Sequence, residues 1–72
     1  MATYRITVLD LDALKTIMGE DFTDASEAYA GKTYTGFTLI EGGMYSGAYQ
    51  GMVGKEDVIF YEDELKSFEK ET

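Results

Sequence analysis

The sequence predicts a small α+β protein, and three observations in chain order support this. Tyr4, Ile6 and Val8 alternate with polar residues, which is typical of a half-buried strand. Leu11, Leu14 and Ile17 or Met18 then fall at helical spacing, and a capping pattern that ends at Gly31 follows. From residue 32 the chain is rich in β-branched and aromatic residues, interrupted by glycine-containing turns. We therefore expect a single domain over residues 1–72, with a strand, one or two short helices and then a sheet.

Two helices are indicated after the first strand. The pattern predicts a helix over residues 11–18, which Gly19 would end. Asp24 and Glu27 have the spacing of a capping box for a second helix. Isolated helices this short are marginal in water, so the second helix must pack on the domain. The side chains available for this packing are Phe22, Ala28 and Tyr29.

The second half of the chain predicts an antiparallel meander of three strands. Its segments are residues 32–41, 43–54 and 56–63. Turns are expected near Gly42-Gly43 and Gly54-Lys55. The last residues, 63–72, predict a short C-terminal helix or turn, with Leu65 and Phe68 against the core. An open sheet and a small barrel both remain possible.

Glycine and tyrosine alternate in the middle segment. Taken as a strand, one of its faces holds Gly43, Tyr45, Gly47, Tyr49 and Gly51. Glycine inside a strand marks a bend, a bulge or a close approach. Two interpretations stay open: a sharply curved sheet whose rings cover the glycines, or a tyrosine-lined groove that receives a partner. We expect Tyr4 and Tyr61 to be structural, and Tyr45 and Tyr49 to be exposed contacts.

Composition excludes several classes of function. Six basic and 14 acidic residues give a formal charge of -8, which opposes direct binding to nucleic acid or anionic membranes and favours a basic protein partner. Cys and His are absent, which removes disulfides, most zinc sites and the usual acid/base group near neutral pH. No apolar run approaches the ~20 residues of a membrane span. We expect an intracellular, non-enzymatic protein with no catalytic residue, metal or cofactor.

The acidic residues form two groups. The first contains Glu20, Asp21, Asp24 and Glu27. The second contains Glu62, Asp63, Glu64, Glu69 and Glu71, with Glu56 and Asp57 in the preceding turn. In an extended chain, residues two apart lie about 6.6–6.8 Å apart on one face, close to the spacing of neighbouring phosphates. Glu62 and Glu64 would then fit a groove that normally binds a phosphate backbone. We expect Glu62, Asp63 and Glu64, the four acids of the first group, and Tyr45 and Tyr49 to contact a partner. The alternative is that the acids serve solubility only.

The chain also shares an overall character with a known class of proteins. Its small size, acidity, lack of Cys and His, and the ending "VIFYEDELKSFE" resemble small phage and prophage inhibitors of host defence, including anti-CRISPR and anti-restriction proteins. The "FYEDEL" ending resembles the last strand of small SH3-like phage proteins. The resemblance implies a stoichiometric inhibitor in the bacterial host cytoplasm, bound to a defence nuclease such as a CRISPR effector at its nucleic-acid site. It transfers no family residues to this chain.

Two rival functions remain open. One is a small protein-interaction module whose acidity serves solubility only. The other is an oligomeric sponge for a nucleotide signal, which requires Arg5, Lys32 or Lys55 to converge on an anionic ligand. The sequence predicts neither the oligomeric state nor the identity of the target.

Overall fold

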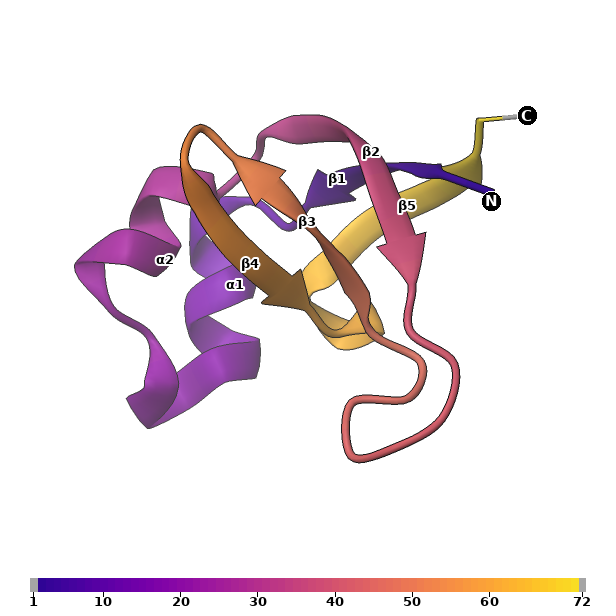
Figure 1. Cartoon of the computed structure of the whole chain (residues 1–72). Coiled ribbons are helices and arrows are strands. Elements are labelled where there is room, and N and C mark those ends of the chain that lie inside the picture. Colours follow the sequence, from indigo (N-terminus) through magenta and orange to yellow (C-terminus); the bar gives the residue numbers. More distant parts are fainter. Residues whose placement is uncertain (1, 72) are drawn as a thin grey trace.

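Over the residues that the structure describes, five antiparallel strands form one sheet, and two helices lie between the first and second strands along the chain (Figure 1). The computed structural model describes residues 2–71. Its elements are β1 (Tyr4–Val8), α1 (Leu11–Met18), the 3-10 turn η1 (Gly19–Asp21), α2 (Asp24–Tyr29), β2 (Thr33–Leu39), β3 (Tyr49–Val53), β4 (Glu56–Phe60), the 3-10 turn η2 (Glu62–Glu64) and β5 (Leu65–Lys70). The strand order is β4-β3-β2-β1-β5. The predicted α+β class is confirmed.

Strand β2 bends because it belongs to both halves of the sheet. Its first residues pair with β1, and Thr38 and Leu39 pair with β3. Within the part that pairs with β1, β2 carries one extra residue between Tyr34 and Phe37, and Gly36 there has a φ of +74°, which favours glycine. Its N–H donates to Oε1 of Glu71 at 2.7 Å. The sheet therefore curls, and the β3–β4 hairpin crosses in front of β1 and β5 (Figure 1).

The core lies inside this curl. Its buried cluster consists of Ile6, Val8, Leu14, Phe37, Tyr49, Phe60 and Leu65. The Phe37 ring covers Gly51, where a Cβ atom would lie 2.5 Å from Phe37 Cδ1. Only glycine fits at that position without displacing the ring. This favours the curved-sheet interpretation of the glycine-rich segment, although the covering ring is a phenylalanine and not a tyrosine.

The two helices begin and end with identifiable signals. Gly19, at a φ of +56°, ends α1, and its N–H donates to the Lys15 carbonyl. The N-cap of α2 is Thr23, whose Oγ1 accepts from the Ser26 N–H at 3.3 Å. The predicted Asp24 and Glu27 capping box is therefore wrong by one residue, because Thr23 has the extended backbone of an N-cap and Asp24 is already helical.

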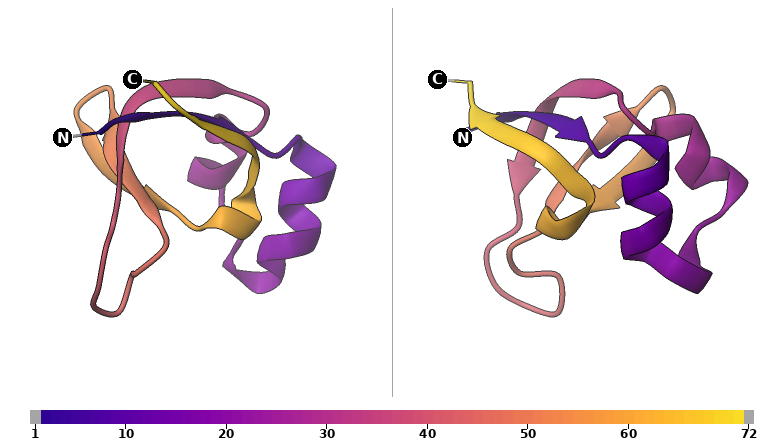
Figure 2. Two further views of the ribbon diagram at one scale, coloured as in Figure 1. Left: turned by 90° about the vertical axis from the view of Figure 1, so that its right-hand side faces the viewer. Right: turned by 180° about the vertical axis from the view of Figure 1, so that it is seen from behind.

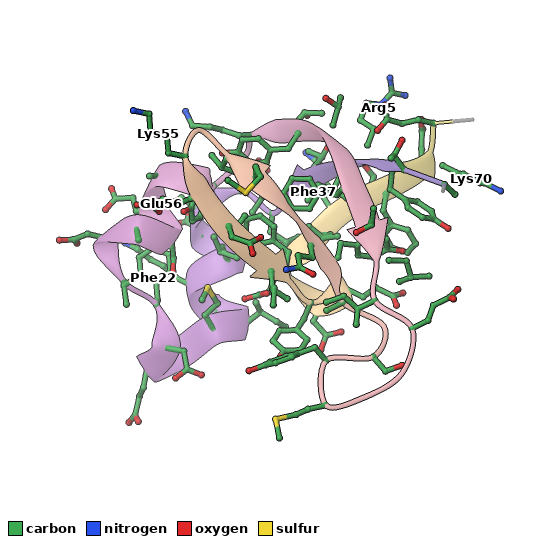
Figure 3. The ribbon with its side chains drawn as sticks, viewed as in Figure 1. Arg5, Phe22, Phe37, Lys55, Glu56 and Lys70 are labelled. Atoms are coloured by element: carbon green, nitrogen blue, oxygen red, sulfur yellow. The ribbon has the colours of Figure 1, made fainter. Side chains whose placement is uncertain are left out.

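Packing of α2 follows the expectation in part. Phe22 and Tyr29 pack against the core cluster, whereas Ala28 is exposed. Tyr29 contacts Phe60 edge to face, with ring centroids 5.4 Å apart. The labelled Phe22 lies beside the helices in Figure 3.

The predicted C-terminal helix is wrong, since residues 65–70 form the strand β5. The helical turn before it, η2, covers Glu62–Glu64. β5 pairs with β1 along its length, from Val8 with Leu65 to Tyr4 with Lys70. Leu65 and Phe68 are three residues apart, a spacing that also fits a helix. The otherwise unpaired edge of β1 decides the outcome, because β5 satisfies its backbone groups.

The predicted three-stranded meander is only part of the observed sheet, and its middle strand was predicted to begin too early in the sequence. β2, β3 and β4 are part of a five-stranded sheet, and β3 begins at Tyr49. Residues 40–48 form a loop instead, closed at its base by hydrogen bonds from Ile40 N–H to the Ala48 carbonyl and from Gly47 N–H to the Ile40 carbonyl. This loop extends away from the sheet in both views of Figure 2. The expected Gly54-Lys55 turn is present between β3 and β4.

Candidate functional site

A hollow of about 320 Å³ lies where α1 and η1 meet the chain around η2. The acidic hollow is lined by Ile17, Met18, Asp21, Tyr61, Asp63 and Glu64. α1 and η2 contact each other, and the right-hand view of Figure 2 shows η2 beside α1. The fold thus brings one member of the first acidic group together with two members of the second.

Backbone hydrogen bonds fix η2 at this position. The Leu9 N–H, just before α1, donates to the Glu64 carbonyl at 3.0 Å. The Glu64 N–H donates to the Tyr61 carbonyl at 2.9 Å, and the Tyr61 N–H donates to Glu64 Oε1 at 2.8 Å. Glu64 therefore has a structural role in its own turn, and its carboxylate is partly committed to the backbone.

Large apolar and aromatic side chains are exposed around the acidic hollow. Ile17 is 53% exposed and Tyr61 is 47% exposed. The Tyr45 ring, from the loop of residues 40–48, lies 6.3 Å from the Tyr61 ring between centroids. Single exposed apolar residues are ordinary, but several beside one hollow are typical of a contact surface.

The carboxylates on this face are not neutralised within the chain. Among residues 2–71, the side chains of Asp21, Glu62 and Asp63 make no hydrogen bond or ion pair. The ion pairs in the same part of the chain lie elsewhere: Arg5 with Glu69, and Lys66 with Asp10. The acidic hollow is therefore open to a cation from outside.

The remaining predicted acids lie near this face or away from it. Glu20 and Glu62 are exposed on η1 and η2 but do not line the hollow. Asp24 and Glu27 are exposed on α2 and do not line it either. The first acidic group is therefore divided, because Thr23 starts a new helix after η1 and turns the chain.

Two tyrosine assignments are wrong. Tyr49 is 4% exposed, and its ring packs 5.2 Å from Tyr4 and 5.3 Å from Phe68 between centroids. Tyr61, expected in the core, is half exposed. The reason is register: Tyr49 pairs with Phe60 on the inner face, and Tyr61 comes after the last paired residue of β4. Tyr45 is 46% exposed, as expected.

The extended spacing expected for Glu62 and Glu64 is also wrong. These residues form a 3-10 turn, which rises only about 2 Å per residue. Glu64 in addition turns back to the Tyr61 N–H. The two carboxylates therefore do not reproduce a phosphate ladder, and any mimicry must come from acids on different elements.

Three residues of the hollow were not anticipated as contacts: Ile17, Met18 and Tyr61. Ile17 fits the apolar stripe of α1, yet Leu14 is the α1 residue that becomes fully buried. The apolar stripe of α1 holds both Ile17 and Met18, which is wider than the core requires. This extra apolar width is the sequence feature that could have predicted an exposed contact residue on α1.

Three tyrosines have raised pKa values, and all three pack in the core. Burial raises the pKa of Tyr49, with smaller effects from Tyr4 and Glu62. Burial also raises the pKa of Tyr29, helped by the Glu56 carboxylate that its hydroxyl approaches at 3.4 Å. The same cause acts on Tyr34. These groups influence stability at alkaline pH rather than chemistry at the hollow.

A second hollow, of about 190 Å³, adjoins the first and shares Met18 and Glu64 with it. It lies between the helices and β4 and is mostly apolar. Basic residues do not gather at either hollow: Figure 3 shows Arg5 and Lys55 at opposite ends of the molecule. Within one described chain, Arg5 and Lys55 therefore do not share a binding site, and an oligomeric nucleotide sponge would have to combine basic residues from different copies.

Comparisons with protein-family models, with curated proteins and with solved structures found no match for this chain. Over residues 2–71, neither helix combines the length and the apolar character needed to cross a membrane. Within the same range, no three acidic side chains are grouped so that they could hold a metal ion.

Proposed function

We propose that this protein is a non-enzymatic inhibitor that binds a basic, nucleic-acid-binding partner through the acidic hollow and the exposed side chains around it. One observation supports this most strongly. Unpaired carboxylates from η1 and η2 converge with exposed Ile17 and Tyr61 on one face. Each element supplies too little for a contact surface alone, whereas together they combine attraction with apolar anchoring.

The charge of the chain suits a partner groove that normally binds phosphates. Such grooves are lined by Lys and Arg, which a chain of formal charge -8 attracts at long range. Rim charges mainly accelerate association, and apolar anchors slow dissociation. With the groove occupied, nucleic acid is excluded. Following the resemblance of the sequence, we propose a bacterial defence nuclease such as a CRISPR effector as the partner, in the host cytoplasm.

We also infer that the curled sheet is a small SH3-like barrel. The strand order β4-β3-β2-β1-β5, the bulge in β2 and the 3-10 turn between β4 and β5 support this inference. A fold of this kind assigns no function by itself. Its contribution is to place η2 beside α1, which forms the hollow.

Two matched double variants test the proposed function. The site variant carries Asp21→Lys and Asp63→Lys, and the control carries Glu27→Lys and Glu41→Lys. All four residues are exposed, and within the described chain none of their side chains is hydrogen-bonded or ion-paired, so both variants change the charge equally and remove no internal contact. Proteins are captured from bacterial lysate on the immobilised wild type and on each variant, and then eluted in salt steps.

We expect wild type and control to retain the same nucleic-acid-binding protein, released by moderate salt or by an added DNA or RNA oligonucleotide. The site variant should bind it at least about tenfold more weakly. Equal retention by both variants would show that the acidic hollow is not the site. Retention that neither salt nor an oligonucleotide weakens would favour the interaction module whose acidity serves solubility.

A further inference from the structure

We infer that the acidic hollow is a receptor for a single arginine side chain presented by the partner. The identity of that partner rests on the proposed function, whereas recognition of arginine is a property of the hollow. The inference goes beyond a general attraction for basic proteins, because it names the chemical group that enters and the residues that receive it.

The lining of the hollow matches the two parts of an arginine side chain. Arginine has an apolar stem that packs along apolar surface and a planar cationic head. Ile17 and Met18 offer the apolar wall for the stem. Asp21 and Asp63 supply carboxylates, and the exposed ring of Tyr61 can accept the guanidinium on its face.

The two carboxylates come from different elements, and this favours arginine over lysine. Asp21 is in η1 and Asp63 is in η2. A guanidinium has five donors in a fixed fork and can bond to two carboxylates in different directions. A lysine ammonium is a compact, strongly hydrated charge and gains less from an apolar and aromatic wall.

The hollow is formed before any ligand arrives. The 2.8 Å bond from the Tyr61 N–H to Glu64 Oε1 and the 3.0 Å bond from the Leu9 N–H to the Glu64 carbonyl hold η2 in place. Asp63 lies between these anchored residues, so little backbone ordering is needed on binding.

No lysine of the described chain fills the hollow in advance. Lys15, in the last turn of α1, places its Nζ 5.6 Å from the centroid of the Phe22 ring. Lys66, which follows η2, pairs with Asp10 at 3.6 Å. The lysines nearest in sequence to the two acids are therefore engaged elsewhere, and the hollow keeps its negative charge.

The test uses the isolated protein and blocked tripeptides, so it needs no natural partner. Isotope-labelled protein is titrated with Gly-Arg-Gly, Gly-Lys-Gly and Gly-citrulline-Gly, and backbone amide shifts are followed by NMR. Citrulline keeps the shape of arginine and removes its charge. Gly-Arg-Gly should shift the amides of residues 17–21 and 61–64 with a dissociation constant on the order of millimolar. Gly-Lys-Gly should bind several-fold more weakly, and Gly-citrulline-Gly should cause no saturable shift.

Variants complete the test. Asp21→Asn with Asp63→Asn should weaken Gly-Arg-Gly binding by about fivefold or more, whereas Glu27→Gln with Glu41→Gln should leave it unchanged. Shifts spread over all acidic residues, or equal binding of the lysine peptide, would overturn the inference.

The outcomes also separate this inference from the proposed function. If partner capture depends on Asp21 and Asp63 but Gly-Arg-Gly causes no saturable shift, the proposed function stands and the arginine-receptor inference is wrong. If Gly-Arg-Gly binds specifically but partner capture does not depend on Asp21 and Asp63, the arginine-receptor inference stands and the proposed function is wrong.

Discussion

The core beneath β3 and the acidic hollow are both built around aromatic and aliphatic side chains, but they differ in what those side chains cover. In the core, Phe37 is fully buried and its ring lies over Gly51. At the hollow, Ile17 and Tyr61 are about half exposed. Side chains that bury one another in the core stabilise the fold, whereas the half-exposed side chains at the hollow keep apolar surface available to a partner.

The carboxylates show the same contrast. Near the end of β5, Glu69 pairs with Arg5, and Glu71 accepts from the Gly36 N–H. At the hollow, Asp21 and Asp63 have no partner among residues 2–71. Acidity therefore has at least two roles in this chain, and a count of acids does not distinguish them.

The largest expected difference comes from two residues of one helix. Leu14→Ala should lower the free energy of unfolding by about 2–5 kcal/mol, because Leu14 is 1% exposed in the core. Ile17→Ala, one turn later, should cost less than about 1 kcal/mol, because half of its surface is already in water. Urea unfolding monitored by circular dichroism measures both. Similar losses would mean that Ile17 is a core residue and not a contact.

Gly51→Ala tests how closely the core is packed. The new Cβ atom would lie 2.5 Å from the Phe37 ring, so the ring or the strand must move. We expect a loss of about 1–3 kcal/mol from overpacking. Met52→Ala, at the next residue and 57% exposed, is the control and should change stability by less than about 0.5 kcal/mol. A neutral Gly51→Ala would show that the curl of the sheet is loosely packed.

The neighbouring acids Asp63 and Glu64 of η2 should differ in how much each contributes to stability. Glu64→Ala removes the acceptor of the Tyr61 N–H and should cost about 1 kcal/mol, comparable to loss of a helix cap. Asp63→Ala should leave the midpoint of urea unfolding nearly unchanged, because its side chain makes no contact of this kind within residues 2–71. If Asp63→Ala were the more destabilising substitution, our division between structural and available carboxylates would be wrong.

The smallest expected effect is the loss of stability at alkaline pH, which tests the burial of Tyr49 in the core. Burial raises the pKa of Tyr49, so the folded state keeps this proton to higher pH than the unfolded chain. Stability is then complete below pH ~10 and falls as pH rises toward and through the folded pKa. Tyr49→Phe should show a smaller loss in urea midpoint between pH ~7 and pH ~11 than the wild type. An unchanged loss would show that this hydroxyl is not buried.

Local sequence patterns predicted the parts of the fold that depend on neighbouring residues. The alternation of Tyr4, Ile6 and Val8 predicted β1, the spacing in residues 11–18 predicted α1, and glycine predicted the turn at Gly54. The strand β5 was missed because its apolar spacing also fits a helix, and its pairing with β1 joins opposite ends of the chain. Long-range pairing of this kind is not encoded in a local period.

The candidate site was predictable only as two separate acidic groups. Nothing local places Asp21 next to Asp63, because their meeting depends on η2 sitting beside α1. The exchanged roles of Tyr49 and Tyr61 have a similar origin. A change in where β3 begins, and in which residue follows the last pair of β4, decides which ring faces inward.

The most direct test of the central claim is a hydrogen-exchange footprint of the protein bound to its captured partner. Backbone amides are compared with and without the partner by mass spectrometry. We expect slowed exchange in residues 17–21 and 61–64, with little change in β5 or at the Gly54-Lys55 turn. Slowed exchange confined to β5 or to that turn, with the residues of the acidic hollow unaffected, would contradict the account.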